Sequence, residues 1–251
     1  MPDLSISIVS HRQIQLVQSL LDDLQKYCSR VSIEVILTVN VEEPLSFDAK
    51  DYGFPIRFVR NAAPKGFGEN HNAAFSLATG DFFCVLNPDI RLVTNPFPVL
   101  IEQVLGANVG LVAPRIVNGD GEREDSAREF PSPLEILRKV FGGKSAVHTD
   151  TVQPVSNPDW VAGMFMLFPR DVFLKIGGFD ERYFLYYEDV DLCARLTLAD
   201  YKILLCSTVS VIHDARRSSH KNLRYMRLHS TRMLRFFLSD VYRQLRQRPS
   251  H

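Results

Sequence analysis

Short apolar runs alternate with amphipathic stretches along the first half of the chain. The apolar runs predict strands at residues 4–9, 33–39, 56–59 and 81–86. Apolar residues spaced three or four apart predict helices at residues 13–27 and 69–78. This order of strands and helices is typical of an α/β fold, so we expect a mainly parallel central sheet covered by helices.

The second half has a less regular pattern. It predicts a strand at residues 109–113, an apolar run at 160–168, helices at 170–176 and 188–199, and strands at 202–206 and 209–213. Residues 118–157 are rich in glycine, proline and charged residues. The stretch is long for a connection that has no secondary structure. We therefore expect a mobile loop there that closes on a ligand, within a single α/β domain over residues 1–215.

Composition narrows the class of protein. With 251 residues, of which 45% are hydrophobic, the chain can bury a full core. Its 29 basic residues balance its 29 acidic residues, which gives no reason to expect nucleic acid as a partner. No secretion signal is visible and no apolar run reaches the roughly 18 residues of a membrane span, so we expect a soluble, cytoplasmic protein. The four cysteines are far apart in apolar segments, which predicts reduced packing residues.

The charge is unevenly distributed, because the C-terminal segment is basic. From residue 216 onward the sequence has a single acidic residue, Asp240. Its basic residues are Arg216, Arg217, Lys221, Arg224, Arg227, Arg232, Arg235, Arg243, Arg246 and Arg248. Apolar residues recur among them at helical spacing: Met226, Met233, Leu234, Phe237, Val241 and Leu245. The pattern predicts a basic helical extension over residues 216–251. Two placements stay open: on an anionic membrane surface, or packed against the domain or against another subunit of a homo-oligomer.

Three carboxylates crowd into four positions of an otherwise apolar segment, as Glu188, Asp189 and Asp191. Ionised carboxylates this close repel one another and resist burial, which indicates a reaction centre; the alternative is an ordinary acidic helix start. On a helix, Glu188 and Asp191 share a face while Asp189 points about 100° away, so we expect the three acids to have different roles. Neighbouring charges raise the pKa of Asp189 and a helix N-terminus lowers it, and both outcomes stay open.

Other polar residues stand where predicted strands end. Asp89 follows an apolar strand, and ligands of open α/β sheets bind beyond the carboxyl ends of strands, so Asp89 is a candidate cation ligand; the alternative is a Pro-Asp turn. His213 ends the last strand, as a ligand or as a surface residue. The glycines Gly66 and Gly68 can bring backbone amides to a phosphate. However, His71 stands where a dinucleotide fingerprint has its third glycine, which disfavours a nicotinamide-binding fold.

Several segments, taken in their order and spacing, form a specific signature. They are SISIVSH at residues 5–11, KGFGENHN at 65–72, LNPD at 86–89, WVAG at 160–163, and GGFDE at 177–181 leading into FLYYEDVDL at 184–192. Across nearly its whole length the chain resembles the GT-A glycosyltransferases of family 2, and within them the bacterial rhamnosyltransferase-like branch.

The resemblance implies a Rossmann-like GT-A domain with a nucleotide-binding half at about residues 1–115 and an acceptor-binding half at about residues 116–215. It implies an inverting transfer from a nucleotide-sugar donor, with a divalent cation, Mg²⁺ or Mn²⁺, on the donor diphosphate. By position, Asp189 matches the general base with Glu188 beside it, and Asp89 and His213 match metal ligands. The implied donor-binding residues are Ser10, His11, Asn40, Lys65, Gly66, Asn72, Asn87 and Asp89. The implied acceptor-binding residues are Trp160, Gly163, Tyr187 and Asp191.

The branch also implies a substrate and a place of action. These are L-rhamnose from dTDP-rhamnose and a glycan or polyprenyl-diphosphate-linked acceptor in bacterial surface polysaccharide synthesis, such as that of O-antigen. An enzyme of this kind would act in the cytoplasm, as a peripheral protein at the inner face of the plasma membrane.

Two departures from the family pattern keep alternatives open. Asn87 replaces the first acid of the Asp-x-Asp metal motif, which removes a charge from the metal site and leaves the need for metal open. The second strand ends without the Asp that contacts the base; Asn40 or Glu42 is the candidate substitute, so uracil and thymine both stay open. The alternatives are a UDP-sugar transferase and a nucleotide-sugar-binding protein without turnover. A nucleotidyltransferase is disfavoured, because no glycine-arginine-lysine loop lies near the first strand.

Aromatic and charged residues near these motifs also have two interpretations. Trp160 and Tyr187 are equally candidates for a sugar-binding platform and for core packing. Arg123, Asp125 and Arg128 lie in the polar stretch, and we interpret them as surface charge rather than as ligands of a diphosphate.

Overall fold

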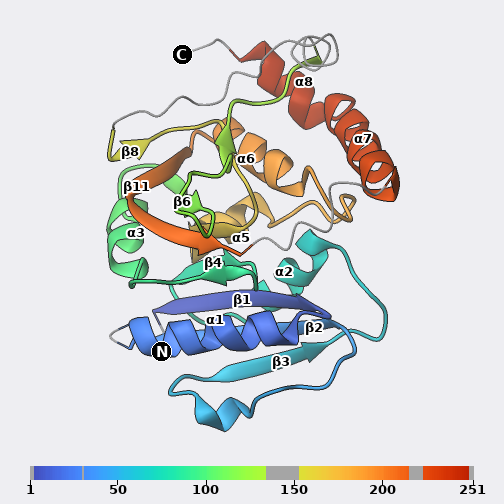
Figure 1. Ribbon diagram of the computed structural model, residues 1–251. Helices are drawn as coiled ribbons and strands as arrows, with labels where there is room; N and C mark the ends of the chain where they lie inside the picture. Colours follow the sequence, from blue (N-terminus) through green and yellow to red (C-terminus); the bar gives the residue numbers. More distant parts are fainter. Residues whose placement is uncertain (1–2, 30, 134–152, 215–222, 249–251) are drawn as a thin grey trace.

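The computed structural model describes residues 3–29, 31–133, 153–214 and 223–248, with the backbone alone for residues 223–228. The described strands form one nine-stranded sheet in the order β3-β2-β1-β4-β10-β6-β11-β5, with β8 beside β11 (Figure 1). Their bounds are β1 Leu4–His11, β2 Ile33–Val41, β3 Ile56–Arg60, β4 Phe82–Leu86, β5 Ile90–Arg91, β6 Val109–Val117, β8 Val155–Ser156, β10 Phe165–Pro169 and β11 Lys202–His213. A second, two-stranded sheet pairs β7 Ala127–Arg128 with β9 Trp160–Val161.

The sheet is mainly parallel, as the alternation of strands and helices predicts. Strands β1, β2, β3 and β4 pair in parallel, as do β6 and β11, whereas β10 runs antiparallel to both β4 and β6. The described helices are α1 Ile14–Tyr27, η1 Ala49–Asp51, α2 Phe67–Phe75, α3 Phe97–Val104, α5 Arg170–Ile176, α6 Glu188–Leu198, α7 Leu223–Phe237 and α8 Asp240–Gln247. The predicted α/β class is confirmed.

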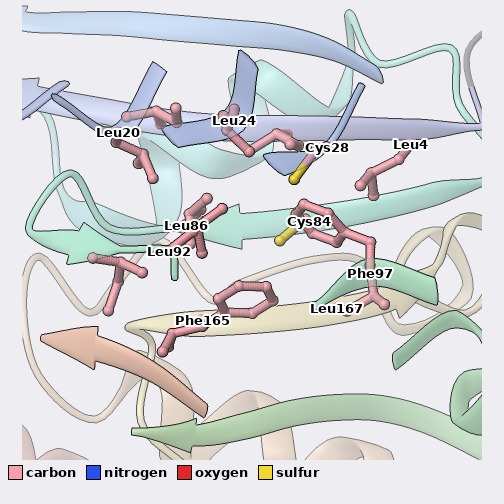
Figure 2. Close-up of a cluster of buried hydrophobic side chains, with 14 of the residues drawn as sticks. Leu4, Leu20, Leu24, Cys28, Cys84, Leu86, Leu92, Phe97, Phe165 and Leu167 are labelled. Carbon is pink, nitrogen blue, oxygen red and sulfur yellow. The ribbon is translucent and has the colours of Figure 1, made fainter. Parts of the chain in front are cut away.

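Two hydrophobic clusters hold the layers together, one on each face of the sheet. Side chains of β1 and β2 pack with α1 and α3 on one face, and Figure 2 shows this cluster around Leu20, Phe97 and Phe165. On the other face, residues of β4 and β10 pack with α2, α5 and α6. Both faces of the central strands are therefore covered, which explains why these strands read as continuous apolar runs.

The cysteines belong to this packing. All four are buried free thiols, and Cys28 and Cys84 lie in the cluster drawn in Figure 2. Burial raises the pKa of Cys84 well above its ordinary value. The prediction of reduced packing residues is confirmed.

Some element boundaries differ from the predicted ones. The strands expected at 202–206 and 209–213 form one strand, β11, whose register shifts between Cys206 and Ser210 in its pairing with β6. The apolar run at 160–168 holds two short strands, β9 and β10, separated at residues 162–164. Helix α3 and strand β5 had no clear signal in the sequence. The middle of the predicted ligand-closing loop, residues 134–152, lies outside the described residues, and its described ends contain the short strands β7 and β8.

The C-terminal helices pack on the rest of the chain. Phe236 of α7 is fully buried beside Tyr183 and Tyr187, and a wider apolar set surrounds these rings: Met233, Phe237, Val241, Tyr242 and Leu245. The apolar pattern of the extension is thus largely used for packing against α6, where Figure 1 shows α7 and α8 in red. Leu234 on α7 and Leu238 just after it stay 58% and 71% exposed. The side chain of Met226 lies outside the described residues. Within the described parts of the chain, no helix is both long and apolar enough to cross a membrane.

Candidate active site

Two polar segments that are far apart in sequence meet through the loop at residues 162–164. The backbone N–H of Asn87, just after β4, donates to the carbonyl of Met164 at 2.9 Å. The backbone N–H of the neighbouring Gly163 donates to Oδ2 of Asp189 at 3.2 Å. A Cβ on Gly163 would lie 3.0 Å from Cζ of Phe67, so the position is too tight for a larger residue to fit without movement. The strand-end motif and the acidic helix start therefore lie at one edge of the sheet.

The Asp89 cluster consists of Asp89, His213 and Glu124. Nε2 of His213 lies 3.3 Å from Oδ2 of Asp89, and Nδ1 of His213 lies 2.7 Å from Oε2 of Glu124. Pairing of β5 with β11 sets His213 opposite Ile90, which fixes this approach. The hydrogen bond to Asp89, then the charges of Asp89 and Glu124, raise the pKa of His213 to about 9 against the opposing effect of burial.

The donor set of this cluster suits a hard divalent cation. Oδ1 of Asp89 is buried and has no hydrogen-bond partner within the described residues. Glu124 holds the far nitrogen of His213, which is how metal-binding histidines are usually oriented. No group of three or more acidic, histidine or cysteine side chains arranged for a metal occurs in the described ranges. Asp89 and His213 would therefore leave further ligands to diphosphate and water, as is common for Mg²⁺ and Mn²⁺.

The Asp189 cluster consists of Glu188 and Asp189 at the start of α6, with Gly163. The chain enters α6 through Tyr186 and Tyr187, both in the left-handed region with φ of 68° and 72°. Oδ1 of Asp189 accepts from the N–H of Val190 at 2.9 Å, in addition to the Gly163 contact. Burial raises the pKa of Asp189, and these two N–H groups only partly offset the effect. Burial decides the direction that the sequence left open.

Glu188 has a different environment from its neighbour. Its side chain is buried, and its Oε2 makes no hydrogen bond to any part of the chain that the structure describes. Burial, and then the negative charge of Asp189, raise the pKa of Glu188 well above its ordinary value. Burial therefore disfavours the charged form of both carboxyls, and the effect is larger for Glu188 than for Asp189.

Asp191 is separated from this pair by its own partner. Its carboxylate is buried and lies 2.7 Å from Nε of Arg195. Nη1 of the same arginine donates to the carbonyl of Ile176. The expectation that the three acids have different roles agrees with these surroundings. Although Glu188 and Asp191 share a helix face, the charge that acts on Glu188 is that of Asp189, and Asp191 is paired with Arg195.

The predicted donor-binding residues near β1 and β2 form an internal network. Ser10 donates to Oε1 of Glu43 at 2.5 Å, and Glu43 also accepts from the N–H of Ile14 at the start of α1. Oδ1 of Asn40 accepts from the backbone N–H of Lys65 at 2.8 Å, while Nδ2 of Asn40 donates to the Lys65 carbonyl. Nδ2 also lies 3.2 Å from Nδ1 of His11, and Nζ of Lys65 lies 3.0 Å from Glu69. In this structure the Asn40 side chain is used to hold the loop before α2.

The glycines and Asn72 of the predicted donor site fasten α2 to the segment that precedes α6. A Cβ on Gly66 would lie 2.8 Å from the carbonyl oxygen of Phe184, and the N–H of Phe67 donates to that oxygen. Asn72 bonds both backbone groups of Phe179 and the carboxylate of Glu181. Close packing between these segments is enough to explain why a glycine stands at position 66, without reference to phosphate binding.

A cavity of about 480 Å³ opens beside Asp89. It lies between the start of α1 and the end of β2. Its lining includes Arg12, Gln13, Glu43, Asp89 and Asp214. This is the carboxyl-terminal edge of the parallel strands, where open α/β sheets bind ligands.

Glu124 was not among the residues predicted for the site, although it contacts His213. Arg128 was interpreted as surface charge, although it lies close to Trp160. The guanidinium of Arg128 lies 5.7 Å from the ring centroid of Trp160, and its charge lowers the pKa of both Asp189 and Tyr187. Trp160 itself donates its indole N–H to the carbonyl of Glu129 at 3.0 Å. The register of β7 with β9, which sets Arg128 opposite Trp160, creates this proximity. A two-residue strand within a polar stretch has no periodicity from which to predict it.

Comparison with known families decides the class of protein. The profile of "Glycosyl transferase family 2" matches residues 5–170, which include both the Asn87-Pro88-Asp89 motif and Gly163. The chain belongs to glycosyl transferase family 2. It is a glycosyltransferase, and the resemblance seen in the sequence is confirmed.

Two curated relatives of this family 2 glycosyltransferase are rhamnosyltransferases. The rhamnosyltransferase WbbL of Escherichia coli is 26% identical over 256 residues, which cover 96% of this chain and 91% of the relative. The N-acetylglucosaminyl-diphospho-decaprenol L-rhamnosyltransferase of Mycobacterium tuberculosis is 30% identical over 152 residues, which cover 57% of this chain and 50% of the relative.

A solved structure agrees with the fold. A crystal structure of GalNAc-T7 with UDP, GalNAc and Mn²⁺ superposes with a TM-score of 0.67 at 14% identity. The match covers 87% of this chain and 45% of that one, so the chain spans less than half of that protein's length.

Proposed function

We propose that this glycosyltransferase moves L-rhamnose from dTDP-rhamnose to a saccharide acceptor linked to a polyprenyl diphosphate, with inversion at the anomeric carbon. One observation carries the proposal. The hydrogen bonds of Asn87 to Met164 and of Gly163 to Asp189 join the Asp89 cluster to a carboxylate with a raised pKa. A diphosphate-binding edge beside a general base is the arrangement that sugar transfer requires.

In the proposed reaction Asp189 takes the proton of the acceptor hydroxyl as its oxygen attacks the anomeric carbon. The bond from that carbon to the donor phosphate breaks, and the electron pair leaves with the nucleoside diphosphate. The Gly163 and Val190 N–H groups hold both oxygens of Asp189 in place. A sugar hydroxyl is a weak nucleophile, so a base in contact with it contributes roughly 10² to 10⁴ in rate.

The diphosphate edge is assigned to Asp89 and His213, with Mg²⁺ or Mn²⁺ as the bound cation. When bound there, the cation neutralises the charge that grows on the departing diphosphate. Glu124 orients His213 in this scheme, and the neutral Asn87 leaves Asp89 as the single acid of the motif. The cavity lined by Arg12, Glu43 and Asp89 is the proposed location of the donor nucleotide.

The donor and acceptor identities rest on the named relatives. The two relatives described above, from Escherichia coli and Mycobacterium tuberculosis, are rhamnosyltransferases. The name of the mycobacterial protein specifies a diphospho-decaprenol acceptor. A lipid-linked acceptor also supports peripheral contact with an anionic membrane. The exposed Leu234 and Arg235 of α7 and the exposed Leu238 just after it form the candidate surface. We expect the wild-type protein to sediment with anionic liposomes in a salt-sensitive manner and a Leu234→Ser/Leu238→Ser variant to sediment less. Unchanged sedimentation of the variant would exclude this surface.

The test of function is a donor panel. The protein is incubated with dTDP-rhamnose and with UDP- and dTDP-hexoses, with and without Mg²⁺ or Mn²⁺, on a lipid-diphosphate saccharide acceptor. We expect transfer from dTDP-rhamnose that requires the divalent cation and is lost in Asp189→Asn. Transfer from a UDP-sugar alone would correct the donor. Binding of nucleotide without transfer from any donor would replace the enzyme by a binding protein.

A further inference from the structure

Two arginines from distant parts of the chain lie on elements that pack against the start of α6. Arg128 lies opposite Trp160 of β9, which contacts α6, and Arg232 follows one turn after His229, whose ring packs on Tyr186 and Tyr187. Arg128 comes from β7, and its charge lowers the pKa of Asp189. Arg232 comes from α7, and its charge lowers the pKa of Glu188. The C-terminal extension therefore reaches the reaction centre, although the family profile ends at residue 170.

Helix α7 is held firmly in this position. The His229 ring packs on Tyr186 and Tyr187 with centroids 5.5 and 5.3 Å apart, immediately before Glu188 in the chain. About two turns further, the fully buried Phe236 ring lies 5.8 Å from Tyr187. Arg128 also acts on His229, because its charge lowers the pKa of that imidazole. Residues of β7, the start of α6 and α7 thus share one small region.

Each arginine has a donor that no described residue satisfies. Nε of Arg128 and Nε of Arg232 are buried without a hydrogen-bond partner in the described ranges, as is Oε2 of the buried Glu188. A buried donor without a partner is costly, so such groups call for a ligand. The present partners are weak: Arg128 pairs with Asp125 at 2.7 Å, but both side chains are about 40% exposed, and Arg232 donates to the carbonyl of Arg182 at 3.3 Å.

We infer that Arg128 and Arg232 bind the phosphate of the acceptor, and that α7 is therefore part of the acceptor site. The inference rests on the proposed function. A guanidinium offers a planar set of donors that matches phosphate oxygens. The donor diphosphate is assigned to Asp89 and His213, so the anion beside Asp189, which deprotonates the acceptor, belongs to the acceptor. A nearly neutral chain thus carries positive charge where an anionic acceptor enters.

The test compares two acceptors that carry the same sugar. One has a lipid diphosphate and the other a neutral alkyl aglycone, and both are presented in neutral detergent so that no anionic headgroup supplies a phosphate. For Arg128→Gln and Arg232→Gln we expect the KM of the diphosphate acceptor to rise about tenfold or more, as for loss of a charge-assisted hydrogen bond. The KM of the donor and the KM of the neutral acceptor stay unchanged. Because each arginine lowers the pKa of a carboxyl in the Asp189 cluster, any change in kcat is shared by the two acceptors.

Arg235→Gln is the matched control. Arg235 lies on the same helix and donates to the same Arg182 carbonyl, at 2.9 Å, so this variant reports the loss of that contact alone. If Arg232→Gln fails to fold, as judged by thermal unfolding, Arg128→Gln decides the question. Equal effects on the KM of both acceptors, a rise in donor KM instead, or an unchanged KM for the diphosphate acceptor would overturn the inference. Failure of the wild-type protein to use either acceptor would instead overturn the proposed function on which it rests.

Discussion

The Asp89 cluster and the Asp189 cluster are both built on carboxylates at one edge of the sheet, yet their surroundings are opposite. Asp89 and Glu124 both face His213 and raise its pKa to about 9, so positive charge is favoured there, and a divalent cation would bind in place of the imidazole proton. Glu188 and Asp189 face each other in a buried place, and the pKa of both is raised. The first arrangement suits the binding of charge, and the second suits the movement of a proton.

The difference shows that proximity in the sequence is a poor guide to shared function. Glu188, Asp189 and Asp191 are neighbours, but Asp191 is neutralised by Arg195. Asp89, Glu124 and His213 are far apart in the chain and meet only because β5 and β6 both pair with β11.

Asp189→Asn should have the largest effect. The amide cannot take a proton, so we expect kcat to fall by roughly 10² to 10⁴ with little change in the free energy of unfolding. The wild-type kcat/KM should also fall at low pH, because Asp189 must be deprotonated, with a midpoint above the ordinary pKa of an aspartate. Steady-state kinetics over a range of pH measure both. Undiminished transfer by Asp189→Asn would remove Asp189 as the base.

Asp191→Asn should affect stability instead. The change leaves Arg195, whose side chain is 21% exposed, without its buried partner, so we expect a loss of about 3 kcal/mol in the free energy of unfolding. The control is Asp240→Asn, which breaks the exposed pair with Arg243 and should cost at most about 1 kcal/mol. Urea unfolding measures both. A variant of full stability that has lost its kcat would instead make Asp191 part of the reaction.

Glu124→Ala tests the orientation of His213. Loss of the second partner of the imidazole should weaken Mn²⁺ binding roughly 10 to 100-fold in the presence of donor nucleotide. Electron paramagnetic resonance of free Mn²⁺ measures this directly. The control is Glu122→Ala, two residues away and exposed. Equal Mn²⁺ affinity in all three proteins would show that Glu124 has no role in the cation site.

His71→Gln, on α2, should have the smallest effect, and the effect is on the pH dependence of the free energy of unfolding. Burial against Phe67 and Phe179 lowers the pKa of His71 to about 3, so the folded protein binds fewer protons than the unfolded chain between pH 3 and 6.5. Stability is therefore lost as the pH falls below 6.5, by up to about 1.4 kcal/mol per pH unit. Urea unfolding at pH 7 and pH 5 should show a smaller loss in His71→Gln. The same loss in both proteins would contradict this account.

Much of the fold was predictable because its signals are local. The apolar runs of β1, β2 and β4 and the periodicity of α1 follow directly from residue order. The sequence also indicated Asp89, Asp189 and His213 as site candidates. It could not indicate Glu124 or Arg128, because their positions depend on strand pairings of a few residues. It could not show that Asn40 and Asn72 bond the chain itself, because those partners are 25 and 107 residues away.

The central claim is that the two clusters divide the work of binding and proton transfer. The most direct test measures Mn²⁺ binding with donor nucleotide, and sugar transfer, in Asp89→Asn and Asp189→Asn side by side. We predict that Asp189→Asn binds Mn²⁺ and nucleotide as the wild-type protein does but transfers no sugar, while Asp89→Asn loses Mn²⁺ binding. Loss of Mn²⁺ binding in Asp189→Asn as well would show that the two carboxylates share one site and would contradict the claim.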